Sequence, residues 1–305
     1  MIRAAFITNR GAVRLENQDA VLIADMVKNS DMNRFETAEI TAYPACFAVV
    51  DGMGGRPGGA EAARLLTETC AEACAGGKFG QKFDPAEDRK VIAEILKEAS
   101  ERMYAESRKN PELSEMGATI AGLLIRENGA MAFNCGDCRV YRFQCGNDIE
   151  KLTKDHSVVQ ALLDMGHISE DEMRTHSRKN IVTSAVVALE AHEPEFYARE
   201  ISRIDDDEYF LCSDGVWETI PADELRGFLS GPFPESADEL LNALLSSGCR
   251  DNISFVWLAN ADAKSPSRNG RGDLAGASPQ ISASKALPSN PTSAKIPQAQ
   301  RKSGD

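Results

Sequence analysis

Residues 49–55 read VVDGMGG and place a charged residue and three glycines after the apolar run CFAVV, residues 46–50. The apolar run is typical of a buried strand, and Asp51 would end it. The glycines that follow remove every side chain that could shelter the aspartate. A carboxylate in this position needs a partner, because an unpaired buried charge costs several kcal/mol.

Four more aspartates stand where strands are expected to begin or end. Asp214 follows an apolar run and precedes a glycine, and Asp137 lies between two such runs. Asp19 and Asp251 each come just before a run. Any one of them alone would fit a turn or a helix cap equally well. Together with Asp51 they form a pattern that turn chemistry does not require.

Five carboxylates gathered at strand ends would repel one another unless a cation offset their charge. Oxygen ligands, with no competing set of histidines and cysteines, favour Mg²⁺ or Mn²⁺ over zinc. Gly52 would let its carbonyl approach an ion closely, and Gly54 and Gly55 would leave room for a bulky anionic substrate. The sequence therefore predicts a pair of divalent ions where the strand at 46–50 ends.

The rest of the first 260 residues predicts an α+β fold. A hairpin turn is expected at Glu127-Asn128-Gly129, and apolar residues recur with helical spacing over 60–74, 85–107 and 236–247. We read these apolar stripes as core. Short strands are expected at 4–8, 20–26, 45–50, 119–125, 130–135, 139–143, 195–199, 208–213 and 253–259. Antiparallel clusters of strands with a few long helices indicate helices packed outside β-sheets.

Composition narrows the class of protein. The 305 residues are 42% apolar, and 34 basic against 47 acidic residues give a formal charge of −13. Such an acidic chain is not expected to bind nucleic acid. No apolar stretch approaches the roughly 20 residues that cross a membrane, and no secretory signal is evident, so we expect a cytoplasmic protein with no membrane contact. Nothing indicates oligomerisation, and monomer is the default.

The composition changes at about residue 261. Residues 261–305 are rich in Ser, Pro, Ala and Gly and carry seven Lys/Arg against three Asp/Glu, so this segment is +4 and the remaining body is −17. Such a segment buries too little apolar surface to order itself. We therefore expect one domain over 1–260 followed by a disordered basic tail over 261–305.

The eight cysteines indicate reduced core residues, because several lie inside apolar runs. Cys135 and Cys138 form a C-x-x-C that could be redox-active or half of a zinc site, although no second Cys/His pair has matching spacing.

Seven short motifs occur in a recognisable order: G-x-x-R-x-x-N-Q-D at 11–19, DGMGG at 51–55, GAT at 117–119, GDCR at 136–139, LTKDHS at 152–157, SDG at 213–215 and DN at 251–252. With these motifs the chain resembles the metal-dependent protein serine/threonine phosphatases of the protein phosphatase 2C (PP2C, PPM) type, and most closely their bacterial branch. The resemblance implies a sandwich of two antiparallel sheets flanked by helices, with a two-metal centre in a cleft at one end.

The resemblance also implies roles for residues of this chain. Asp51 would bridge two Mn²⁺ or Mg²⁺ ions, the Gly52 carbonyl would bind one, and Asp214 and Asp251 would bind the other.

Four further residues match outer positions of such a centre. Asp19 and Gln18 match positions that hold metal-bound waters. Asp137 matches a ligand of a third, weaker ion, and Glu218 stands where the family commonly has another acid for that ion.

Arg14 is expected to clamp the substrate phosphate, because a guanidinium offers paired donors to its oxygens. The alternative is a surface ion pair with Glu16 or a similar neighbour. Arg56 replaces a histidine that the family usually has. Because arginine stays protonated, either a metal-bound water protonates the leaving group, or Arg56 holds the phosphate and turnover is slower.

The segment from 157 to 200 matches the family's mobile flap beside the cleft. His167 and His176 are expected on the surface of that flap. His156, just before it, is expected to be a structural residue that is hydrogen-bonded near the cleft floor.

The function expected on these grounds is hydrolysis of phosphoserine and phosphothreonine by a metal-activated water, without a phosphoenzyme intermediate. The partners would be phosphorylated proteins, the substrates of a serine/threonine kinase. One alternative is a catalytically impaired PP2C-like module that binds phosphoproteins, which only Arg56 favours. The other is a nucleotide-binding domain, but Pro57 stands where a third glycine belongs and Glu72 falls within a helix.

Overall fold

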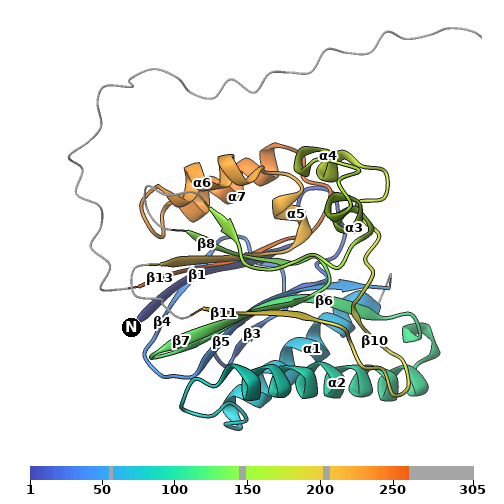
Figure 1. The fold of residues 1–305 in the computed structure, drawn as a ribbon. Coiled ribbons are helices and arrows are strands. Elements are labelled where there is room, and N and C mark those ends of the chain that lie inside the picture. The colour runs from blue at the N-terminus through green and yellow to red at the C-terminus, as the bar shows by residue number, and fades with distance from the viewer. Residues whose placement is uncertain (55–57, 144–148, 202–206, 261–305) are drawn as a thin grey trace, which may run out of the picture. The chain divides into compact units, whose positions relative to one another are not determined.

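Two antiparallel β-sheets lie face to face, with helices on the outer side of each (Figure 1). The computed structural model describes residues 1–54, 58–143, 149–201 and 207–260. The α+β sandwich expected from the resemblance is thereby confirmed.

The strands of each sheet come from distant parts of the chain. The first sheet has the order β4 (Glu36–Ile40), β1 (Ile2–Asn9), β13 (Ile253–Asn260), β12 (Glu208–Cys212), β8 (Arg139–Phe143) and β9 (Glu150–Lys151). The second has the order β11 (Tyr197–Ile201), β7 (Gly129–Cys135), β6 (Gly117–Arg126), β5 (Ala45–Met53), β2 (Asp19–Ile23) and β3 (Met26–Lys28), with β10 (Val186–Val187) paired to β6. The predicted hairpin is confirmed, since Arg126 of β6 pairs with Gly129 of β7.

Long helices cover the second sheet and shorter ones the first (Figure 1). Helices α1 (Gly58–Ala75) and α2 (Pro85–Lys109) pack on the second sheet, and α5 (Asp214–Trp217), α6 (Ala222–Leu229) and α7 (Ser236–Ser246) lie over the first. Helices α3 (Val158–Asp164) and α4 (Glu170–Thr175) lie in the flap, and a 3₁₀ turn spans Pro111–Leu113.

The start of α2 shows how local sequence sets an element. Asp84 is the N-cap, and its carboxylate accepts hydrogen bonds from the backbone N–H groups of Ala86 and Glu87. Pro85 occupies the first helical position, where its missing N–H is not needed. Arg108 and Lys109 in the last turn complement the helix dipole. The predicted helix at 85–107 is therefore found where its caps require it.

Two apolar clusters hold these layers together. One lies between the sheets and extends beneath α6 and α7, and its fully buried members include Phe6, Phe210 and Trp257. The other lies between the second sheet and the helices α1 and α2, with Leu66 and Ile92 fully buried. The apolar helical stripes at 60–74 and 85–107 are thus core residues, as the sequence indicates.

Three parts of the fold differ from the sequence-based expectation. The run at 20–26 forms two strands, β2 and β3, because the chain turns at Ala24, which has a φ of +58°. Strand β4 was not predicted, because the sequence ETAEI is mostly exposed at the sheet edge and lacks an apolar face. The short helices α3 to α6 were also not predicted.

Candidate metal centre

A cleft of about 290 Å³ opens where strands of both sheets end. Asp51 at the end of β5 and Asp214 at the start of α5 line it together with Asp251, just before β13. The sequence-predicted residues that the structure brings together along this cleft are Arg14, Gln18, Asp51, Gly52, Asp137, Asp214 and Asp251. The described lining also includes Met53, Gly54, Thr119, Asn180, Val182 and Asn252.

Strand register places the carboxylates close together. Asp19 of β2 lies directly opposite Asp51 of β5, and Asp51 lies opposite Thr119 of β6 on its other side. In the other sheet, β12 pairs with β13, so that Asp214 after β12 and Asp251 before β13 leave the sheet at the same end. Antiparallel pairing therefore explains why carboxylates far apart in the sequence meet here.

The carboxylates of this cluster are held in an environment that disfavours their charge. Burial raises the pKa of Asp51 well above its ordinary value, and the charges of Asp19 and Asp214 raise it further. Burial also raises the pKa of Asp214 well above its ordinary value, with Asp137 the next contributor. For Asp137 itself, burial and then the charge of Asp155 raise the pKa to about 7.

Asp19 shows the shortage of partners most directly. Its Oδ2 accepts a hydrogen bond of 2.9 Å from Ser213 Oγ, whereas its buried Oδ1 has no hydrogen-bond partner in the described part of the chain. Burial raises the pKa of Asp19 to about 7. A buried carboxylate oxygen without a donor is what a cation or a cation-bound water would satisfy.

Two glycines of the DGMGG motif are required by close packing. A Cβ on Gly52 would lie 2.0 Å from the Gly59 carbonyl oxygen and 2.6 Å from that of Gln18. Gly54 has a φ of +112°, and a Cβ there would lie 2.5 Å from the Glu115 carbonyl oxygen. The sequence analysis assigned Gly54 to substrate room alone, but neighbouring backbone also excludes a side chain there. Gly55 lies outside the described residues.

Arg14 is the only cationic side chain among the described residues that line the cleft. Its Nη2 lies 2.5 Å from Asp251 Oδ2, and its Nε donates to the Arg250 carbonyl at 3.3 Å. The hydrogen bond to Asp251 raises the pKa of the guanidinium. The ion-pair partner of Arg14 is thus a candidate metal ligand, a pairing that the sequence did not indicate.

Asn252 joins the loop that carries Arg14 to the start of β13. Its Oδ1 accepts from the Gln18 N–H at 2.9 Å, and its Nδ2 donates to the carbonyls of Glu16 at 2.9 Å and Arg10 at 3.1 Å. The sequence analysis quoted Asn252 within the DN motif but gave it no role. The sequence did offer one signal for such a role. Asn252 has both a donor and an acceptor in its side chain, and it stands next to a predicted metal ligand.

The residues fit a divalent-cation site of the open kind. The donor set consists of carboxylates and one backbone carbonyl, which hard cations prefer. In the described part of the chain, no three His, Cys, Asp or Glu side chains form a group that could by themselves hold a metal ion. Mg²⁺ sites commonly keep several waters and use only one or two carboxylates, and the cleft offers such a set.

Comparison with known proteins identifies the family. The family model described as "Protein phosphatase 2C" matches residues 34–255, which is more than half of the chain. The chain belongs to the protein phosphatase 2C family. The antiparallel sheets of this family exclude the nucleotide-binding alternative, which requires a parallel βαβ unit.

Two bacterial proteins show how similar the chain is to named phosphatases. The chain is 30% identical to the serine/threonine phosphatase stp of Listeria innocua over 84% of this chain and 94% of that protein. It is 28% identical to the serine/threonine protein phosphatase PstP of Mycobacterium tuberculosis over 84% of this chain, but this match covers only 44% of PstP. The chain therefore spans less than half the length of the PstP relatives that it matches.

Solved PP2C structures share the fold. The crystal structure of the Mycobacterium tuberculosis phosphatase PstP has a TM-score of 0.68 and 26% identity, with 85% of this chain and 99% of that chain covered. The catalytic domain of PstP in complex with two manganese ions has a TM-score of 0.67 and 27% identity, with 85% and 97% covered.

Glu218 and the flap meet at the edge of the PP2C cleft. Lys179 forms an ion pair with Glu218, and Arg174 Nη2 donates to the carbonyls of Glu218 at 3.2 Å and Thr219 at 3.3 Å. Asn180, next to Lys179, lines the cleft. Sequence reasoning missed both flap contacts, because neither follows from spacing.

His156 binds the loop that carries Asp137, in keeping with a structural role. The Gly136 N–H donates to His156 Nδ1 at 3.2 Å, and the His156 N–H donates back to the Gly136 carbonyl at 2.9 Å. Burial lowers the pKa of His156. His167 is exposed, as expected, whereas His176 is half-buried.

The C-x-x-C does not have the features of a redox or zinc site. Cys135 Sγ lies 3.6 Å from Ser184 Oγ, whereas Cys138 Sγ lies 3.2 Å from Thr119 Oγ1. Burial raises the pKa of Cys135 to about 12 and that of Cys138 well above its ordinary value. Reactive thiols need a lowered pKa, which is the opposite shift.

Two other expectations remain. Arg56 lies outside the described residues. No described helix is long and apolar enough to cross a membrane.

Proposed function

We propose that this protein is a metal-dependent phosphatase that hydrolyses phosphoserine and phosphothreonine in proteins by attack of a metal-activated water, with no phosphoenzyme intermediate. The observation that carries the proposal is the group of mutually repelling carboxylates in the cleft, together with the unsatisfied oxygen of Asp19. The PP2C relatives named serine/threonine phosphatases support it.

The chain's residues would hold two Mn²⁺ or Mg²⁺ ions. Asp51 would bridge the ions and the Gly52 carbonyl would bind one of them. Asp214 and Asp251 would bind the other. When bound, such a pair lowers the pKa of a water to near 7 and offsets phosphate charge during in-line displacement.

Outer residues would complete the centre. Asp19 and Gln18 would hold metal-bound waters, and the unpartnered oxygen of Asp19 supports this role. Asp137 would contribute to a third, weaker ion. Glu218 would join it only after leaving Lys179, so we rank it below Asp137.

Arg14 would bind the phosphate. A cation on Asp251 competes with Arg14 for the same carboxylate, and the released guanidinium, half of whose side chain is exposed, is then free to take phosphate oxygens. We expect Arg56 to slow turnover, so Arg56→His should raise the rate constant for an alkyl phosphate. An unchanged rate constant would contradict this account of position 56.

Hydrolysis of p-nitrophenyl phosphate and of a phosphothreonine peptide tests the function. Wild type should turn over both substrates with Mn²⁺ or Mg²⁺ and neither with a chelator, and comparing the two metals shows which supports faster turnover. Asp214→Asn should lose the activity, whereas the exposed Asp223→Asn in α6 should keep it. Turnover that is absent or independent of metal would instead favour the catalytically impaired phosphoprotein-binding module.

A further inference from the structure

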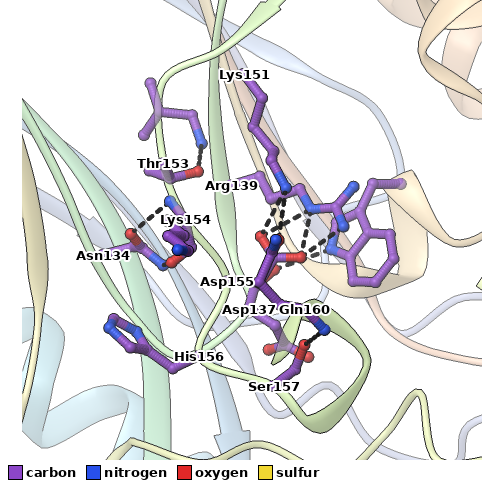
Figure 2. Close-up of polar contacts among 12 residues, drawn as sticks. Asn134, Asp137, Arg139, Lys151, Thr153, Lys154, Asp155, His156, Ser157 and Gln160 are labelled. Carbon is purple, nitrogen blue, oxygen red and sulfur yellow. Dashed lines mark hydrogen bonds and ion pairs between the residues drawn. The ribbon is translucent and has the colours of Figure 1, made fainter. Parts of the chain in front are cut away.

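Arg139 is a buried cation that is not among the described residues lining the cleft. The guanidinium carbon of Arg139 lies 3.5 Å from the centroid of the Trp217 ring, and both side chains are buried. Asp155 holds Arg139 through Nε at 3.1 Å and Nη2 at 2.6 Å, as Figure 2 shows. Arg139, Asp155 and Trp217 are called the brace below.

The brace is bonded to the loop that carries Asp137. Trp217 Nε1 donates a 3.0 Å hydrogen bond to the Asp137 carbonyl. Trp217 is also the last residue of α5, and Asp214 is the first. One short helix therefore carries a cleft carboxylate, Asp214, at its start and, at its end, the N–H that binds the backbone of a second cleft carboxylate, Asp137.

The same loop is also fixed from the side of the second sheet. Asn134 Nδ2 donates to the carbonyls of Gly136 and Lys154, both at 2.9 Å, and Figure 2 shows Asn134 beside Lys154. His156 exchanges two hydrogen bonds with Gly136. These contacts hold Gly136 against the segment that leads into the flap. The contact to Trp217 is different, because it ties the loop to α5.

The bond matters because the two carboxylates repel each other. Asp137 and Asp214 both line the cleft, and the charge of Asp137 is the largest contributor after burial to the raised pKa of Asp214. Repulsion would move α5 and the loop apart unless something joined them. The brace joins them through the buried N–H of Trp217. The Trp217 ring packs against Arg139, which is itself paired with Asp155.

We propose that Trp217, held by Arg139 and Asp155, is a positioning residue that keeps Asp137 and Asp214 at the spacing needed to bind divalent ions. This inference rests on the proposed metal centre. It assigns to Trp217 no contact with substrate or ion. The effect of losing it is therefore expected in metal affinity and not in the binding of substrate.

The chain offers a matched pair of variants, because it has two tryptophans. Trp217→Phe keeps a smaller aromatic ring for Arg139 and removes the N–H that binds Asp137. Trp257→Phe removes the equivalent N–H from the same apolar cluster, where Trp257 Nε1 donates to Glu208 Oε2 at 2.8 Å on strand β12. Both variants delete one buried indole hydrogen bond, but only that of Trp217 is made to a residue that lines the cleft.

Titration calorimetry with MnCl₂ on the full chain is the measurement. Trp217→Phe should weaken Mn²⁺ binding at the weakest detected site by about tenfold or more, as outer-shell changes at metal sites do. Its activity should need more Mn²⁺ for half saturation, with KM for p-nitrophenyl phosphate unchanged at saturating metal. Trp257→Phe should bind Mn²⁺ like wild type even if its melting temperature falls.

Each outcome decides between the inference and the function on which it rests. Wild-type Mn²⁺ affinity in folded Trp217→Phe, or equal weakening in Trp257→Phe, overturns the positioning role and leaves the metal centre standing. Wild type that binds no Mn²⁺ overturns the proposed function itself, and the positioning role with it. If Trp217→Phe does not fold, Arg139→Lys, which keeps the charge but loses the two-point contact with Asp155, must show the same weakening, and wild-type affinity there also overturns the inference.

Discussion

Buried aspartates in this molecule have two opposite environments. In the cleft, burial and then neighbouring carboxylates raise the pKa values of Asp51 and Asp214. Outside the cleft, the buried Asp155 pairs with both Arg139 and Lys151. A buried aspartate that is paired with cations stabilises the fold. A group of buried aspartates that repel one another indicates a candidate cation-binding site.

The comparison gives a physical criterion for function. Burying a paired carboxylate is tolerable, whereas burying several unpaired ones costs stability that folding alone does not require. Sites that must bind a charged ligand often keep such a cost. The cleft carboxylates are therefore best explained by the cation that they would bind.

The largest expected effect comes from substituting one of the mutually repelling carboxylates of the cleft. Asp51→Asn should lower Mn²⁺-dependent hydrolysis of p-nitrophenyl phosphate by at least about 10³-fold, because metal-assisted activation and charge neutralisation are both lost. The metal-free variant should be at least as thermally stable as wild type, because one repelling charge is gone. Activity within tenfold of wild type would show that Asp51 does not bridge the ions.

Substituting Asp155, the aspartate that is paired with cations, should lower the stability of the fold. Asp155→Asn leaves Arg139 buried without its counter-charge and should lower the free energy of unfolding by about 3–5 kcal/mol. Asp88→Asn is the matched control, because Asp88 pairs in the same bidentate way with Arg126, seven residues along β6 from Thr119. Urea unfolding should show a large loss for both. A loss under about 1 kcal/mol for Asp155→Asn would mean that the pairing of Asp155 with Arg139 does not stabilise the fold as described.

Arg14 combines the two environments, because it forms an ion pair with Asp251, which is itself one of the cleft carboxylates. Arg14→Ala should raise KM for p-nitrophenyl phosphate by about tenfold, because one charge-assisted contact to phosphate is removed. Arg14→Lys should recover only part of this, because a lysine cannot offer paired donors. Unchanged steady-state kinetics in Arg14→Ala would reduce Arg14 to a surface ion pair.

The smallest expected effect concerns Asp19 in the metal-free protein. Asp19→Asn should raise the melting temperature in the presence of chelator by a few degrees, on the scale expected for about 1 kcal/mol. The amide can donate toward Asp51, whose carboxyl group lies within hydrogen-bonding range of Asp19, and it adds no charge. Saturating Mn²⁺ should remove this advantage. A lower melting temperature in chelator would argue that the Asp19 carboxylate is already satisfied.

Much of the fold could be predicted from the sequence, because it depends on local patterns. Alternating and continuous apolar runs located most strands, and the helical spacing of apolar residues located α1, α2 and α7. The edge strand β4 and the break at Ala24 were missed, because neither has a local apolar signature.

The site was predicted as a set of residues but not as a set of contacts. Asp51, Asp137, Asp214 and Asp251 were found because each stands in a short motif at a strand end. The pairing of Arg14 with Asp251 and of Lys179 with Glu218 depends on where distant segments meet. Such contacts follow from strand register and flap position, which spacing within the chain does not determine.

Mn²⁺ binding to the purified chain tests the central claim most directly. Titration calorimetry should find at least two Mn²⁺ ions per chain, all removed by chelator, with a melting temperature that rises with free Mn²⁺ as mass action requires. Asp51→Asn should abolish the tight binding while the chain stays folded. A folded wild-type chain that takes up no Mn²⁺ or Mg²⁺, and whose melting temperature does not change with either, would contradict the account.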